Sequence, residues 1–140
     1  MRSFVFLCLT ATALVASPIE TIRAVGKGGE GNAAAAAALE ELCAGDASQL
    51  VSILQGMRGA NPLAANWLRS AVDVIADRAG KDLPVAELGE FLLDRSQNPR
   101  ARRLSFELIA KVDAAAAEAM VGSIPAPMFT SASTPRLTRT

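Results

Sequence analysis

Apolar residues recur along the chain at intervals of three and four. This spacing places their side chains on one face of an α-helix, the face that packs against the rest of a protein. One stretch contains Leu63, Trp67, Leu68, Ala71, Val72 and Ile75, and a second contains Ala101, Leu104, Leu108, Ile109 and Val112. No window shows the β-branched alternation of a half-buried strand. The pattern predicts an all-α fold.

Residues that favour the beginning of a helix stand in front of most predicted helices. Ser17–Glu20 and Asp46–Gln49 have the pattern of a capping box, in which the first side chain accepts a backbone N–H three residues later. Asn61 and Asn98 are each followed by a proline, which suits the first helical position. The other predicted starts are Asn32, Leu83-Pro84 and Asp113.

The two Asn-Pro steps also indicate an internal repeat. They lie 37 residues apart (98 − 61), and at that offset apolar positions fall on apolar positions. The matches are Val51 on Leu88, Leu54 on Phe91, Ala64 on Ala101 and Ala71 on Leu108. Helix pairs that repeat about every 40 residues are typical of HEAT and armadillo proteins, so residues 33–121 are predicted to form a short HEAT/armadillo-like stack of antiparallel helix pairs. An ordinary bundle of two helical hairpins is the alternative.

The length of this stack bears on its stability. Each pair buries its apolar face only against its neighbours, so about three pairs are needed for a stable fold. The sequence pattern gives two pairs and a fragment. We therefore expect marginal stability, or association through the exposed end.

The first 17 residues have the layout of a secretory signal peptide. Arg2 supplies a positive charge, Ser3–Val15 is apolar or weakly polar, and small residues follow at Ala16 and Ser17. Such a segment is removed on export, so the mature chain is expected in the periplasm or outside the cell. The apolar run is shorter than the roughly 20 residues of a membrane-spanning helix. The cleavage position stays open, because the large Leu14 lies third before a cut after Ala16.

Residues 18–32 are predicted to form a short helix and a glycine-rich loop. The loop, Gly26–Gly31, has the letters G-x-G-x-x-G of a dinucleotide-binding fingerprint. That fingerprint follows a β-strand within a βαβ unit, whereas a capped helix is predicted before this loop. A flexible connection between helices is therefore favoured. A small nucleotide- or cofactor-binding protein that uses Gly26–Gly31 is the alternative function.

Composition excludes several classes of chemistry. The 140 residues include no histidine, and Cys8 is expected to leave with the signal, which makes Cys43 the one remaining thiol. Histidine-based catalysis and a four-ligand zinc site are thereby excluded. Fourteen basic residues balance fourteen acidic ones, which gives no positive field for nucleic acid. We expect no enzyme, no cofactor and no metal, and a buried Cys43.

The candidate interaction surface is the basic cluster of Arg100, Arg102 and Arg103. It could hold an acidic protein or an anionic cell-surface partner, and a solvated helix start is the alternative. Glu107 lies four residues from both Arg103 and Lys111, which predicts ion pairs along one exposed helix face.

Trp67 and the pair Asp73/Asp77 each have a functional and a structural interpretation. Trp67 could stack on a sugar, but its apolar neighbours favour a place in the core. Asp73 and Asp77 share one helix face, where they cannot span a cleft as the carboxylates of a glycosidase do. Arg69 and Lys81, four residues outside the pair on either side, are expected to balance them.

The stretches Gly59–Arg78 and Phe91–Asp113 resemble the N-terminal helical part of a family of uncharacterised secreted bacterial proteins with HEAT-like repeats. The resemblance extends from Ile19 to about Val121. It implies a helical-repeat scaffold or protein-interaction domain, followed in the family by a β-rich module suited to carbohydrate or surface binding. It implies no catalytic residue.

The chain departs from that family at its end. Residues 122–140 contain three prolines, seven serines or threonines, two arginines and no acidic residue. This composition lacks helical periodicity and predicts a disordered tail. We expect the chain to be a piece of a longer protein, truncated or shifted in reading frame after about Val121.

Overall fold

The computed structural model describes residues 16–122. Residues 1–15 and 123–140, which include most of the predicted signal peptide and nearly all of the predicted tail, lie outside the described residues. Residues 16–122 form seven α-helices, one short 3-10 helix and no strand, so the predicted all-α fold is confirmed. In chain order the elements are α1 (Pro18–Arg23), α2 (Asn32–Ala44), η1 (Ala47–Gln49), α3 (Leu50–Gly56), α4 (Pro62–Ala79), α5 (Val85–Leu93), α6 (Pro99–Val112) and α7 (Ala114–Gly122).

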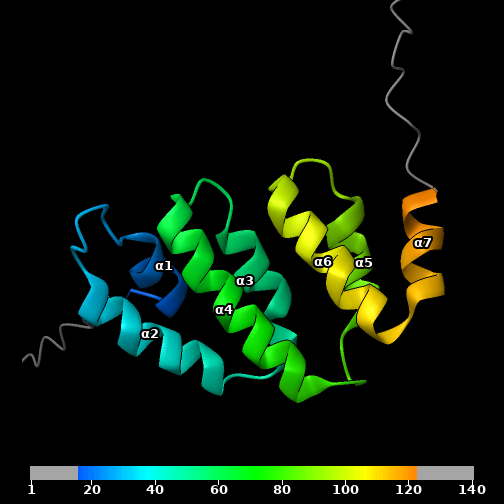
Figure 1. Ribbon diagram of the computed structural model, residues 1–140, viewed down its shortest axis with the longest axis horizontal. Coiled ribbons are helices and arrows are strands. Elements are labelled where there is room, and N and C mark those ends of the chain that lie inside the picture. Colours follow the sequence, from blue (N-terminus) through cyan, green and yellow to red (C-terminus); the bar gives the residue numbers. More distant parts are fainter. Residues whose placement is uncertain (1–15, 123–140) are drawn as a thin grey trace, which may run out of the picture.

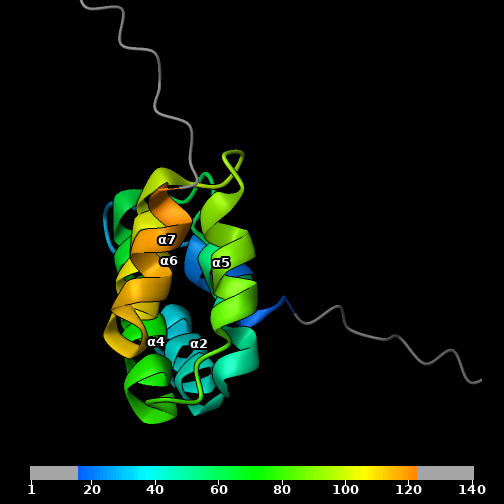
Figure 2. The same ribbon diagram turned by 90° about the vertical axis from the view of Figure 1, so that its right-hand side faces the viewer.

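The helices form a stack of antiparallel pairs. Helix α1 packs on α2, α3 on α4 and α5 on α6, while α7 lies against α5 and α6. The turns within the pairs lie along one edge of the stack, at the top of Figure 1, and the links between pairs lie along the opposite edge. Helices α4 and α6 lie in front of α3 and α5 in Figure 1, and Figure 2 shows α5 on the opposite side from α4 and α6. The stack therefore has two layers.

Helix α1 adds a pair that the sequence pattern does not predict. Ile22 and Val25, which precede the predicted repeat domain, are buried in the same apolar core as Leu68 of α4. Gly56 allows α1 to approach α3, because a Cβ atom there would lie 2.5 Å from Cγ2 of Ile19. The expectation of two pairs and a fragment is therefore too low: residues 16–122 hold three pairs and the single helix α7.

The apolar faces predicted for α4 and α6 point into this core. The buried residues of these faces are Leu68, Ala71, Val72, Ile75, Ala101, Leu104, Leu108 and Ile109. Leu63 and Trp67 are half-buried at the margin of the core. Ser105 is fully buried, and its hydroxyl donates to the Leu88 carbonyl at 2.7 Å. This bond satisfies a polar group between α5 and α6 that burial would otherwise penalise.

Four predicted helix starts are confirmed by side-chain caps. Oδ1 of Asn61 accepts the N–H of Ala64 at 2.9 Å, and Oδ1 of Asn98 accepts the N–H of Arg100 at 2.9 Å. The other two caps are those of Ser17 on α1 and Asp113 on α7. Each cap satisfies a backbone donor that the first helical turn leaves without a partner.

Two helix starts differ from the prediction. Asp46 accepts the backbone N–H of Ser48 rather than that of Gln49, and the 3-10 helix η1 therefore precedes α3. Gly31, with φ 79°, takes the N-cap position predicted for Asn32, which instead begins α2. The loop requires left-handed backbone at this point, and glycine adopts it without a steric penalty.

The two Asn-Pro turns make the same second contact. The side-chain amide of Asn61 donates to the Val25 carbonyl at 2.7 Å, and that of Asn98 donates to the Met57 carbonyl at 3.1 Å. Each asparagine thus caps its own helix with the amide oxygen and binds the preceding pair with the amide nitrogen.

Arginine side chains also join the turns of neighbouring pairs, by donating hydrogen bonds to backbone carbonyls. Arg23 donates to the Arg58 carbonyl at 3.1 Å, and Arg58 in turn donates to the Ser96 carbonyl at 2.5 Å. At the opposite edge, Arg78 of α4 donates to the Cys43 carbonyl at the end of α2, at 2.7 Å. The first and second pairs are therefore hydrogen-bonded to each other at both edges, and the second and third pairs at the edge of the Asn-Pro turns.

Candidate interaction surface

The structure places the three arginines of the predicted cluster in different surroundings. Arg102 is half-buried, and its Nε donates to the Leu92 carbonyl at 2.6 Å, so it joins α6 to the end of α5. Arg103 is exposed and pairs with Glu107. Arg100 is exposed and lines a hollow of about 420 Å³ beside the Asn-Pro turns. Arg100 is thus the member of the cluster that remains open to a partner.

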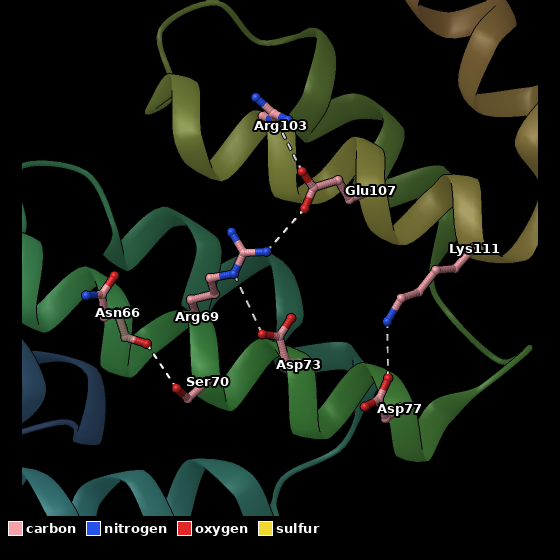
Figure 3. A network of polar contacts seen from close by, with 8 residues as sticks. All are labelled: Asn66, Arg69, Ser70, Asp73, Asp77, Arg103, Glu107 and Lys111. Atoms are coloured by element: carbon pink, nitrogen blue, oxygen red, sulfur yellow. Dashed lines mark hydrogen bonds and ion pairs between the residues drawn. The ribbon is translucent and has the colours of Figure 1, made fainter.

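An ion-pair network connects α4 and α6 across the front of the stack (Figure 3). Arg69 lies 3.7 Å from Asp73 in its own helix and 3.3 Å from Glu107 of α6. Glu107 also pairs with Arg103 at 3.1 Å. Such exposed pairs contribute little stability, about 0–1 kcal/mol each. We call these residues, together with Asp77 and Lys111, the α4/α6 seam.

The seam confirms part of the predicted charge pairing and corrects the rest. The expected pairs Arg69–Asp73 and Arg103–Glu107 form within their helices. Lys111 was expected beside Glu107, but its Nζ lies 3.2 Å from Asp77 of α4. Lys81 was expected to balance Asp77, but it lies in the turn after α4, and Lys111 takes that place.

The glycine-rich loop is closed by its own carboxylate. Helix α1 precedes the loop, so the strand that a dinucleotide fingerprint requires is missing at this point. Oε2 of Glu30 accepts the N–H of Gly28 at 3.0 Å, and a Cβ atom at Gly26 would lie 2.3 Å from the same oxygen. A negative charge thus occupies the inside of the loop, where a phosphate would need to bind.

Trp67 lies at the surface margin between α2 and α4. It is half-buried, and with Leu39, Leu63, Asn66 and Ser70 it lines a shallow hollow of about 260 Å³. The hydroxyl of Ser70 donates to the Asn66 backbone carbonyl at 3.1 Å, as Figure 3 shows. The prediction that Trp67 belongs to the core therefore holds only in part, because the side chain packs against the core but is only partly buried.

Cys43 is only half-buried near the end of α2, which is less than the predicted burial. Burial raises the pKa of its thiol, and the nearby Arg78 guanidinium partly opposes that shift. A thiol with a raised pKa holds less of the reactive thiolate at neutral pH. Cys43 is thus a margin residue of the core rather than an activated nucleophile.

A groove that the sequence pattern does not indicate opens between α3 and α5, on the side of the stack opposite the α4/α6 seam. Its volume is about 520 Å³. Its apolar lining consists of Ala47, Val51, Pro84 and Phe91, and its acidic lining of Asp82, Glu87, Glu90 and Asp94. Of the lysines and arginines in the part of the chain that the structure describes, none lines it. We call it the acidic groove.

The acidic groove could have been found only in part from the sequence. Glu87, Glu90 and Asp94 are spaced at i, i+3 and i+7, which marks a charged helix stripe beside the apolar one. The opposing wall comes from η1 and α3, more than thirty residues earlier in the chain, and only packing brings the two walls together.

Between residues 16 and 122 no cluster of three Cys, Asp or Glu side chains is arranged to hold a metal ion. In the same part of the chain, no helix combines the length and the apolar character that crossing a bilayer requires. In comparisons with protein-family models, curated proteins and solved structures, nothing matches this chain.

Proposed function

We propose that this protein is an exported, non-enzymatic helical-repeat scaffold that binds another protein and forms part of a longer HEAT-like protein. The observation that carries the proposal is the equivalence of the two Asn-Pro turns. Asn61 and Asn98 each cap their own helix and donate to the preceding pair. Two unrelated hairpins in a bundle have no reason to share both contacts, whereas copies of one repeat do.

A stack of this kind suits binding better than chemistry. Each pair contacts only its neighbours, so the surface extends along the stack and its shape follows from how the pairs pack. The acidic groove lies between two consecutive pairs that Arg58 and Asn98 tie together through backbone carbonyls. A preorganised groove loses little conformational entropy when a partner binds.

The alternative, a nucleotide or cofactor bound by Gly26–Gly31, is disfavoured by the Glu30 carboxylate inside the loop. Titration with ATP and with NAD, followed through the amide resonances of Gly28 and Gly31, tests it. We expect no saturable shift, because bound phosphate and carboxylate would repel each other. A saturable shift that the Glu30→Gln variant strengthens would favour the alternative.

Export is tested with the full chain carrying a C-terminal epitope in a bacterial host. We expect the epitope outside the cytoplasm and a new N-terminus near residue 17 by mass spectrometry. Leu7→Arg/Leu9→Arg places charges in the apolar run and should keep the chain inside with its N-terminus intact. Retention of the unaltered chain in the cytoplasm would contradict export.

Binding is tested by photo-crosslinking in the same host. A photoreactive amino acid at exposed Glu87, on the acidic groove, is compared with one at exposed Glu41, on α2. The proposal requires a defined crosslinked protein from at least one position, identified by mass spectrometry. Equal, diffuse labelling from both positions would contradict a binding function.

A further inference from the structure

We propose that the acidic groove binds an extended cationic peptide that carries apolar side chains between its basic residues. This inference rests on the proposed function as a protein-binding scaffold, and it names the surface and the chemistry of the partner.

The floor of the groove is suited to an apolar side chain. Val51 is half-buried on α3, and Phe91 of α5 forms part of the core as well as of the groove. Ala47 and Pro84 complete the apolar lining. A volume of about 520 Å³ exceeds that of one large side chain, and apolar surface buried there contributes about 25 cal/mol per Å².

The rim of the groove carries negative charge that the fold does not neutralise. Glu87 and Glu90 are exposed on α5, and neither side-chain carboxylate has a hydrogen bond or ion pair to another described residue. Asp94 accepts the Ser96 N–H at 2.9 Å and the Gln97 side-chain amide at 2.8 Å, and these bonds hold its pKa below the usual range. Asp94 therefore stays ionised.

Two cations near the groove, Arg58 and Lys81, are not part of its lining. Arg58 lies close enough to Asp94 to favour its charged form, but its guanidinium donates to the Ser96 carbonyl. Lys81 is exposed in the turn beside Asp82 and is not part of the lining. The rim thus presents two carboxylates, Glu87 and Glu90, that have no ion-pair partner among residues 16–122. Such carboxylates attract a cationic partner and repel nucleic acid.

The spacing of these carboxylates sets the spacing of the basic residues in the partner. Glu87 and Glu90 lie on one stripe of α5, and Asp94, the C-cap residue just after this helix, also lines the groove. Seven residues of α-helix rise about 10 Å. An extended peptide covers about 3.3 Å per residue. Two basic residues three positions apart therefore match the two ends of this set, Glu87 and Asp94, and the residues between them can turn an apolar side chain toward Val51 and Phe91.

The test uses the full chain and a fluorescent synthetic peptide, Gly-Arg-Leu-Ser-Arg-Phe-Ala-Arg-Gly, in an anisotropy titration. We expect saturable binding that weakens when the salt concentration rises from about 0.02 M to about 0.15 M. A peptide with each Arg replaced by Glu should not bind. A peptide with Leu and Phe replaced by Ser should bind more weakly, because it leaves the floor uncovered.

Matched variants locate the binding site. Glu87→Gln/Glu90→Gln should weaken binding about tenfold, as expected for two unscreened ion pairs. Glu40→Gln/Glu41→Gln removes the same charge from the exposed face of α2 and should change the affinity less than about twofold. The amide resonances of Val51 and Glu87 should shift on binding, and the Trp67 indole resonance should not.

Three outcomes would overturn the inference: no saturable binding, an equal loss of affinity in both double variants, or equal binding of the Glu-containing peptide. If these occur while a position outside the groove still crosslinks a defined protein, the scaffold function stands and the assignment of the groove is wrong. If crosslinking fails as well, the scaffold function also fails.

Discussion

The α4/α6 seam and the acidic groove lie on opposite sides of the same two helix pairs. The carboxylates of the two regions differ in whether they have an ion-pair partner. In the seam, Asp73, Asp77 and Glu107 each lie within 4 Å of an arginine or lysine. In the groove, Glu87 and Glu90 have no such neighbour within residues 16–122. The comparison shows that one side joins the pairs through ion pairs, while the other leaves Glu87 and Glu90 without an ion-pair partner among residues 16–122.

Both sides depend on the shared core, so a cavity in it should have the largest effect. Leu108 of α6 is 1% exposed. Leu108→Ala should lower the free energy of unfolding by about 3 kcal/mol, measured by urea denaturation followed by circular dichroism. Val74→Ala, at a residue 47% exposed, is the control and should change it little. Similar losses in both variants would argue against one continuous core.

The Asn-Pro turn is the next largest contributor, since it positions both sides of the third pair. Asn98→Ala removes a helix cap and the bond to Met57, and it should cost about 2 kcal/mol. Asn66→Ala, at an exposed position within α4, should stay within about 0.5 kcal/mol of the unaltered chain. A loss no greater at Asn98 than at Asn66 would remove the structural role assigned to the turn.

The contrast between the seam and the groove predicts a smaller difference in the free energy of unfolding, between a variant of the seam and a variant of the groove. Glu107→Gln breaks two ion pairs and should lower the free energy of unfolding by about 0.7 kcal/mol at low salt, with less loss at high salt. Glu87→Gln/Glu90→Gln breaks none and should cause no loss. The comparison fails if the groove variant is the more destabilised of the two.

The smallest expected effect is a pH dependence at Asp94. Hydrogen bonds from Ser96 and Gln97 lower its pKa in the folded chain, so it stabilises the fold above the ordinary aspartate pKa of about 3.9. That contribution is lost as the pH falls from there through the folded-state pKa. Asp94→Asn should therefore flatten the acid limb of the stability curve, whereas Asp82→Asn, which lacks these bonds, should not.

Local sequence features predict the helices well because they act within one helical turn. The caps at Ser17, Asn61, Asn98 and Asp113 each bind a backbone N–H two or three residues away. The pairs Arg69–Asp73 and Arg103–Glu107 obey the i, i+4 rule for the same reason.

Predictions fail where the partner lies on another helix. Lys111 reaches Asp77 of α4, and Arg102 reaches the Leu92 carbonyl, neither of which follows from spacing along the chain. The three candidate arginines therefore differ in role. Arg102 joins α6 to α5, Arg103 belongs to the seam, and Arg100 is exposed. The helix that follows Ser17 is predicted, but its pairing with α2 is missed for a related reason, because that contact depends on how the two helices pack.

The amino-acid sequence by itself determined where helices begin and which of their faces are apolar, since capping and periodicity are settled by neighbouring residues. Only the tertiary structure decided which charges are neutralised and which remain available. Ion pairing and groove formation depend on how closely and at what register two helices approach, and that distance is fixed by the packing of all the side chains between them.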